Sequence, residues 1–220
     1  MGFWEEFLPA LFSGLIVTLK MLAVAMPASI LLGILLGTLR VYGGKVLKTI
    51  ATAIVVIFRG FPLTVTLLIL FFGLADFHIY LTPYWAAVIG FTLCSGSYQS
   101  EYVRGAIRSI DEGQSIAAKA LGMSRFQEVT YIILPQALRR ALPGVSNELI
   151  YMVKYSSLAF IVGVPEMFSV AKTYNSQWFM PMEIFLALAV IYLAMTTALT
   201  IAFKWLECKL EIPGLKITTK

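Results

Sequence analysis

The sequence has little charge and few reactive side chains. Only 13% of its 220 residues are charged, whereas 59% are hydrophobic, and soluble domains do not have this balance. It contains one histidine, His78, and two cysteines, Cys94 and Cys208. These residues have neither metal-ligand spacing nor a disulfide pattern, and no Ser/His pair can be assembled around His78. We therefore expect an integral membrane protein with no metal site and no catalytic site of its own.

Other common features are also missing. No G-x-x-x-x-G-K-[ST] string is present, so ATP would have to be bound by another chain. No internal repeat or long polar linker divides the chain, which predicts a single domain over residues 1–220. The net charge of +5 is not gathered into a basic run, so it does not indicate nucleic acid as a partner.

Long apolar segments dominate the sequence. A bilayer crossing needs about 20 mainly apolar residues, and the segments predict an all-α integral membrane fold of about five transmembrane helices. The first segment is longer than one crossing needs, so residues 7–19 either extend beyond the bilayer or lie along its surface. The second is interrupted by Gly60, Phe61 and Pro62, which predicts a kinked or broken helix. The predicted spans are approximately 21–39, 50–75, 84–104, 141–164 and 184–204.

Lysine and arginine collect in alternate connections, and this asymmetry predicts the orientation. Basic residues mark the cytoplasmic side of a membrane protein, which places the N-terminus outside and the C-terminus in the cytoplasm. The basic groups are Arg40, Lys45 and Lys48, then Arg104 through Arg140, then Lys204, Lys209, Lys216 and Lys220. The opposite side receives mostly acidic residues, namely Glu5, Glu6, Asp76, Glu166 and Glu183, with His78 and Lys172.

The longest predicted cytoplasmic connection, residues 109–135, reads as two helices joined at a glycine. Residues 116–121 form a short Ala-rich segment that ends at Gly122. Ser124 and Gln127 have capping-box spacing, which starts a second helix that we expect to close before Pro135. Its alanines and apolar side chains suit a groove on a partner protein. The alternative is an ordinary amphipathic connection packed on the protein's own helices.

The same connection resembles the signature cytoplasmic loop of ABC importer permeases. The resemblance rests on Ala117-Ala118, Gly122, then nine residues, then Ile132, Leu134 and Pro135. Further strings are similar to the polar amino acid branch of that family: Arg59-Gly60-Phe61-Pro62-Leu63, Glu101 with Arg104-Gly105 and Ser109-Ile110, Gly113-Gln114, residues 135–139, and Ser157-Leu158 with Gly163-Val164. One residue departs from the pattern, because Ile116 stands where the family usually has Glu.

The resemblance implies a function and a set of partners. It implies the transmembrane subunit of an ATP-driven importer for a polar amino acid, in a prokaryotic inner membrane. It also implies a second permease copy or sister subunit, two ATP-binding subunits that hold ATP and Mg, and an external solute-binding protein. This chain would bind no cofactor. A coupling helix between spans 3 and 4 would dock on the ATPase through Ala117, Ala118, Leu121, Gly122, Met123, Phe126 and Pro135.

Charged residues inside the predicted spans are candidates for the substrate pathway, because charge is costly in a bilayer. Arg59 or Lys154 would meet an α-carboxylate, and Glu148 an α-ammonium group. Alternatively, Glu148 and Lys154 pair structurally with neighbouring helices, or Arg59 begins its span at the surface. The predicted pathway comprises Arg59, Asn147, Glu148, Tyr151, Lys154 and Tyr155, next to the Gly60–Pro62 break.

Glu101 and Arg104 lie one helical turn apart near the cytoplasmic edge of the third span, where we expect a pair that supports the loop or forms an inner gate. A secondary transporter or channel for small polar solutes is the alternative function. It is disfavoured by the single helix break and the absence of related halves. The amino acid transported, homodimer versus heterodimer, and the division of selectivity between permease and binding protein stay open.

Overall fold

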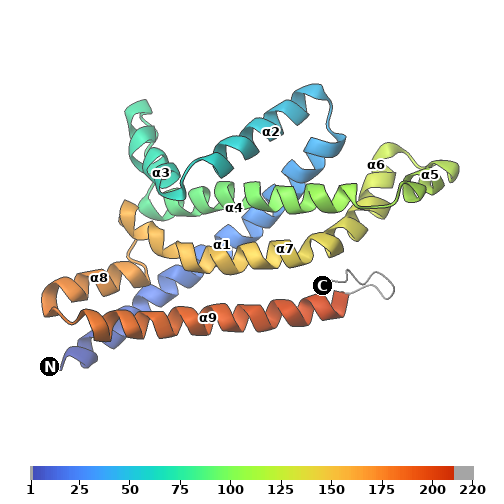
Figure 1. Cartoon of the computed structure of the whole chain (residues 1–220). Coiled ribbons are helices and arrows are strands. Elements are labelled where there is room, and N and C mark those ends of the chain that lie inside the picture. The colour runs from blue at the N-terminus through green and yellow to red at the C-terminus, as the bar shows by residue number, and fades with distance from the viewer. Residues whose placement is uncertain (1, 211–220) are drawn as a thin grey trace.

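The computed structural model describes residues 2–210, and the chain in that range consists of helices and short turns (Figure 1). α4, α7 and α9 run side by side in Figure 1, and α1 crosses them diagonally. The α-helices are α1 (Phe3–Tyr42), α2 (Lys45–Gly60), α3 (Leu63–Leu68), α4 (Pro83–Arg108), α5 (Glu112–Ala120), α6 (Arg125–Gln127), α7 (Leu134–Tyr155), α8 (Met167–Trp178) and α9 (Pro181–Leu210). π-Helical turns cover Ile69–Gly73 and Glu128–Ile133, and 3₁₀ turns cover Leu74–Phe77 and Ser156–Val162.

α1 is one helix of 40 residues. Of the two alternatives for residues 7–19, the structure shows a continuation of the same helix. This extension is covered by protein, because Phe7 and Leu11 pack with Met167 of α8 and Ile184 of α9. The N-terminal end of the molecule therefore has a hydrophobic core of its own.

The predicted break after α2 is confirmed. α2 and the helical segment that begins at Leu63 meet at a bend of 109°. Phe61 and Pro62 separate them, with extended backbone torsions at both residues. The apolar run over residues 46–75 is therefore two helical pieces with different directions.

α1 and α4 approach each other closely through small residues. A Cβ on Gly33 would lie 2.7 Å from the Cβ of Gln99, and a Cβ on Gly37 would lie 2.9 Å from the carbonyl oxygen of Ser100. Small residues at such contacts are how helices pack tightly in membranes. Next to this contact, Met21 and Phe91 belong to the largest buried cluster.

One expectation about a helix end was wrong, and one helix was not anticipated. The second helix of the 109–135 connection does not close before Pro135, because α6 continues through the π-helical turn into α7, whose first turn contains Pro135. Pro135 follows the π-helical turn directly, where the regular α-helical hydrogen-bond pattern is already interrupted, so its missing N–H is accommodated there. α8 was not expected at all. It forms because Glu166 caps it, accepting hydrogen bonds of 2.8 Å from the backbone N–H groups of Phe168 and Ser169.

Within residues 2–210, two helices, α1 and α9, are long and apolar enough to cross a bilayer. The number rises to four if each of two bent pairs is counted as one span, namely α2 with the residues up to Phe77, and residues 125–162 with α8. The protein is thus an all-helical membrane protein with two to four candidate spans, and five spans stay a prediction.

The two ends of the helix layer differ. α5 and α6 lie at one end, near the end of α1 and the start of α2, whereas α8 lies at the other end with the N-terminus (Figure 1). α9 begins beside α8 and ends on the side of α5 and α6. Lys216 and Lys220, which contributed to the predicted orientation, lie outside the described residues.

The α1–α4 contact generates a stability prediction. Gly37→Ala places a Cβ 2.9 Å from the Ser100 carbonyl oxygen and from the Val103 Cβ, neither of which can swing aside. We expect the free energy of unfolding to fall by about 1–3 kcal/mol, as for overpacked cores. The measurement is the midpoint of thermal unfolding in detergent, which should be lower than for the unaltered protein. Gly105→Ala on α4 is the control, because its Cβ meets open space. Equal midpoints for the two variants would contradict the close approach.

Candidate functional site

The break between α2 and α3 leaves backbone carbonyl groups without helical partners. Pro62 has no N–H to donate to the carbonyl of Phe58. Side chains of α4 occupy the two exposed acceptors instead: the Cys94 thiol donates to the Phe58 oxygen at 3.1 Å, and the Tyr98 hydroxyl donates to the Arg59 oxygen at 3.5 Å. The broken backbone is therefore held against α4.

A pocket of about 380 Å³ lies at this break. Glu148 of α7 is a buried acid in its wall, and the Tyr155 hydroxyl donates to Glu148 Oε1 at 3.1 Å. Arg59 borders the same pocket, which therefore has one side chain of each charge sign. The lining residues are Arg59, Gly60, Phe61, Pro62, Leu63, Cys94, Tyr98, Glu148, Tyr155 and Leu158.

The five predicted pathway residues of α7 lie on two faces of the helix. Glu148 and Tyr155 line the pocket, but Asn147, Tyr151 and Lys154 are exposed on a different face. Positions 148 and 155 share one stripe of a helix, whereas 147, 151 and 154 share the next. Within residues 2–210 neither Glu148 nor Lys154 forms an ion pair, and the Lys154 ammonium lies 4.7 Å from the centre of the Tyr151 ring.

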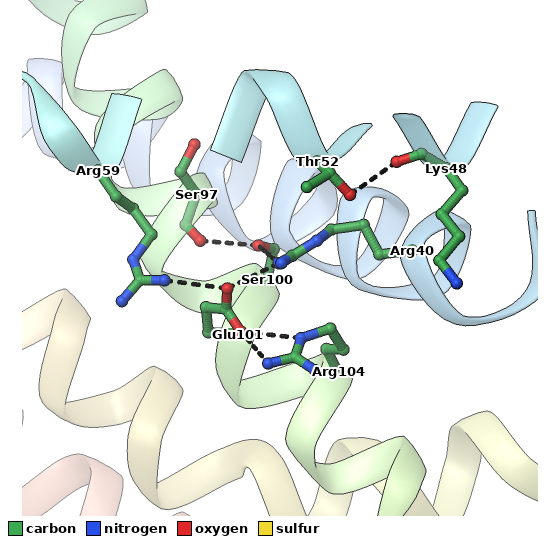
Figure 2. A network of polar contacts seen from close by, with 8 residues as sticks. All are labelled: Arg40, Lys48, Thr52, Arg59, Ser97, Ser100, Glu101 and Arg104. Carbon is green, nitrogen blue, oxygen red and sulfur yellow. Dashed lines mark hydrogen bonds and ion pairs between the residues drawn. The ribbon is translucent and has the colours of Figure 1, made fainter. Parts of the chain in front are cut away.

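Glu101 of α4 binds three arginines from three helices, as Figure 2 shows. Its Oε1 accepts from Arg40 of α1 and from Arg59 of α2, each at 2.9 Å. Its Oε2 accepts from Arg104 through Nε at 2.8 Å and Nη2 at 2.6 Å. One carboxylate thus serves three guanidinium groups, and the cluster keeps an excess of two positive charges.

The cluster both confirms and corrects the sequence expectations. The Glu101–Arg104 pair is present, but Arg40, which was assigned only to the charge pattern, is a third partner that sequence reasoning missed. Arg59 was assigned only to the substrate pathway, so its contact with Glu101 was missed as well. In the structure α2 is inclined to α4 (Figure 1), so Arg59 reaches both Glu101 and the Tyr98 ring, whose centre lies 5.2 Å from its guanidinium carbon.

The predicted helix–glycine–helix elbow of residues 109–135 is present. Gly122 has a φ of +74°, a conformation that favours glycine. The capping box is also confirmed, because the Ser124 hydroxyl accepts from the Gln127 N–H at 3.3 Å and Gln127 Oε1 accepts from the Ser124 N–H at 2.9 Å. α5 starts earlier than expected, since Asp111 caps it by accepting from the Gly113 N–H at 2.7 Å.

The surface of the elbow differs in part from the prediction. Leu121 is 81% exposed and Phe126 is 74% exposed, so apolar side chains do face outward. Ala117 is exposed, but Ala118 is buried against its own chain and does not present a small surface to a partner. Ala118 therefore packs inside the elbow.

Polar contacts hold the elbow to the helix layer. The buried Glu128 carboxylate accepts two hydrogen bonds from Arg125, at 2.9 and 3.1 Å. A hydrogen bond from Ser115, together with the Arg125 guanidinium, keeps the pKa of Glu128 below its ordinary value although burial acts to raise it. Arg125 also lies over the Tyr42 ring at the end of α1, with 4.7 Å between guanidinium carbon and ring centre.

Two more contacts brace the elbow from α7. Gln136 donates to the Gln114 side chain at 3.2 Å. Arg140 donates to the Ser109 hydroxyl at 3.0 Å and to its carbonyl oxygen. The elbow is therefore fixed to α1 and α7 through side chains of the chain itself, and its apolar tip is left uncovered.

Comparison with known proteins identifies the family of this chain. Residues 29–212 match the family described as binding-protein-dependent transport system inner membrane component. The chain is 38% identical over 209 residues to the probable amino-acid ABC transporter permease protein PatM of Vibrio harveyi, covering 94% of each chain. It is 34% identical over 207 residues to the glutamine transport system permease protein GlnP of Escherichia coli strain K12, covering 93% of this chain and 94% of the relative.

Solved structures share the fold. A chain in the crystal structure of an amino acid ABC transporter with histidines superposes with a TM-score of 0.84 and 30% identity, over 95% of this chain and 99% of the other. A chain of the inward-facing MetNI methionine ABC transporter gives a TM-score of 0.78 at 23% identity, over 96% and 100% of the two chains.

These matches are to permease components and cover nearly the whole chain, so they argue against the alternative function of a secondary transporter or channel. The family forms the membrane component of the importer and is not catalytic, so the chain is not an enzyme. Its place is the inner membrane of a bacterium, which it crosses more than once. The chain therefore belongs to the family of binding-protein-dependent transport system inner membrane components, as a permease subunit of an ABC importer.

Proposed function

We propose that this permease passes a polar amino acid through the pocket at the α2–α3 break. The observation that carries the proposal is the pairing of opposite charges in one cavity, since Arg59 and Glu148 both line it. An amino acid carries a carboxylate and an ammonium group, and charge-assisted hydrogen bonds are the strong ones. The pocket volume of about 380 Å³ suits a small solute. The relatives named for amino acid and glutamine transport support the same class.

Arg59 is the side chain best placed to bind the incoming carboxylate. Its side chain is 40% exposed, compared with 11% for Arg40 and 26% for Arg104. It shares Oε1 of Glu101 with Arg40, whereas Arg104 alone holds Oε2. If Arg59 turned toward a substrate, Glu101 would keep two partners. Arg59 can therefore change partners without leaving an unpaired acid.

We place the C-terminus and the elbow on the cytoplasmic side and count five spans. The spans are α1, α2 with α3, α4, α7 with its 3₁₀ end, and α9. The support is the charge pattern. The start of α2 and the end of α9, whose sequences include Lys45, Lys204 and Lys209, lie toward the elbow, whereas the starts of α1 and α9, whose first turns contain Glu5 and Glu183, lie at the other end (Figure 1).

The elbow is proposed as the coupling helix for two ATP-binding subunits, which would hold ATP and Mg. The exposed Leu121 and Phe126, with the half-buried Met123, supply an apolar tip for a groove on the ATPase. Gly122 sets the direction of the tip through its positive φ. Ile116 is 66% exposed and adds apolar area where the family usually has an acid.

A second permease copy and an external binding protein complete the proposed assembly. Asn147, Tyr151 and Lys154 form an exposed stripe on α7. A lysine on a predicted span is costly against lipid, so this stripe is proposed to face a neighbouring subunit or a water-filled passage. Whether that neighbour is the same chain or a sister subunit is left open.

The pocket proposal predicts the effect of Glu148→Gln. Losing the carboxylate removes one charge-assisted bond, so the substrate concentration for half-maximal uptake should rise about 10- to 100-fold. The measurement is uptake of radiolabelled glutamine, arginine and histidine by proteoliposomes that contain the complete transporter. Glu183→Gln, an exposed acid in the first turn of α9, is the matched control. Unchanged uptake of every transported amino acid, with the complex intact, would sink the proposal.

The coupling proposal predicts a loss of ATPase docking for Gly122→Val. A side chain at a φ of +74° costs about 1–2 kcal/mol, so the elbow should leave its present direction. We expect less ATPase to co-purify and substrate-stimulated ATP hydrolysis to fall roughly 5- to 30-fold. Gly44→Val is the control, because Gly44 has a negative φ and open space around it. If Gly122→Val behaved like the control, the elbow would not be the docking site.

A further inference from the structure

A second cavity lies among α1, α4, α7 and α9, apart from the charged pocket. Its volume is about 210 Å³, and nine of its eleven lining residues are Ile, Val, Leu or Phe. Ile34, Val103, Leu142 and Phe203 represent the four helices. No lining residue carries a charge. Its size exceeds that of the apolar cavity of about 150 Å³ that binds benzene in a well-studied engineered protein.

Two buried polar atoms in this wall have no partner. Gln99 is 1% exposed and Ser146 is 2% exposed, yet Gln99 Oε1 and Ser146 Oγ make no hydrogen bond within residues 2–210. An unpaired buried polar group is costly, so each one calls for a partner. Both residues line the cavity, although each of the two atoms exposes less than 1 Å² in the present arrangement. A partner in the cavity relieves that cost when the two side chains turn toward it.

The surrounding contacts fix which end of the Gln99 amide is unpaired. The Ser29 hydroxyl donates to the Met26 carbonyl at 2.8 Å, so it accepts from Gln99 Nε2, also at 2.8 Å. The same Nε2 donates to the Ser95 hydroxyl at 3.0 Å. The amide NH₂ is thus fully used, and Oε1 is left as an acceptor. The missing partner is therefore a hydrogen-bond donor.

The position of the cavity indicates where such a donor comes from. α1 and α9, the two helices able to cross a bilayer, both contribute to the wall. α9 is loosely packed beyond its first turns, since its only buried residues are Ile184 and Leu188. Phe203 at the cavity is only half-buried. A ligand can therefore reach the cavity from the lipid beside α9.

We propose that this cavity, bounded by Gln99 and Ser146, binds a neutral alkyl amphiphile that carries a hydroxyl group. The alkyl chain fills the apolar walls, and the hydroxyl donates to Gln99 Oε1 and bonds Ser146 Oγ. Water alone matches the two polar atoms, but it leaves the nine apolar lining residues without packing partners. A charged headgroup is excluded because no counter-charge lines the cavity. The site is independent of the pocket at the α2–α3 break.

The test is photolabelling of the complete transporter in lipid nanodiscs. The probe is decanol with a diazirine in its chain, and the same diazirine on decane lacks only the hydroxyl. We expect the alcohol to label the α7 and α9 residues that line the cavity in a saturable way, with competition by unlabelled decanol. The decane probe should label them weakly and without saturation.

Ser146→Ala should weaken saturable labelling about five-fold, as for one neutral hydrogen bond, and Ser146→Thr, which keeps a hydroxyl, should restore it. Ser157→Ala is the matched control, because that hydroxyl bonds the Lys154 carbonyl outside the cavity. If the Ser146→Ala transporter does not assemble, the site is tested by comparing the alcohol probe with the alkane probe on the unaltered protein. Equal labelling by alcohol and alkane, or labelling that decanol does not compete, would overturn the site and leave water or bare lipid chains as the occupants.

Discussion

The shared carboxylate of Glu101 joins three helices and, through Arg59, reaches the wall of the charged pocket. It binds Arg40 of α1, Arg59 of α2 and Arg104 of α4 within 2.9 Å. Without it, three partly buried guanidinium groups would repel one another, and water would screen that repulsion only in part. Glu101 therefore acts together with the Cys94 and Tyr98 contacts to hold α2 against α4, with its broken end beside the pocket.

The same end of α1 also receives the elbow. Arg40 enters the Glu101 cluster, and two residues later the Tyr42 ring lies under Arg125 of the elbow. Arg125 is in turn bound to the buried Glu128. The end of α1 therefore contacts Arg125 of the element proposed to dock the ATPase, and it contacts Glu101, which binds the Arg59 proposed to meet the substrate. This chain of contacts is a physical route for coupling between the two sites.

Local signals predicted much of this structure, and tertiary geometry accounts for the rest. The break at Pro62, the Gly122 elbow and the Ser124 capping box are set by backbone chemistry within a few residues, so the sequence predicted them. The Arg59–Glu101 contact depends on the inclination of α2, which no local pattern encodes. Ala118 was misjudged because composition does not tell which side of a short helix meets its own chain.

The central claim is that Glu101 positions Arg59 for the substrate, and a double-mutant cycle tests it most directly. Arg59→Gln, Glu101→Gln and the double variant are compared by the amino acid concentration that gives half-maximal ATP hydrolysis in the complete transporter. The account predicts that the double variant needs nearly the same amino acid concentration as Arg59→Gln. This result corresponds to a coupling energy of about 0.5–3 kcal/mol between the two residues. Effects that add to within about 0.5 kcal/mol would contradict it.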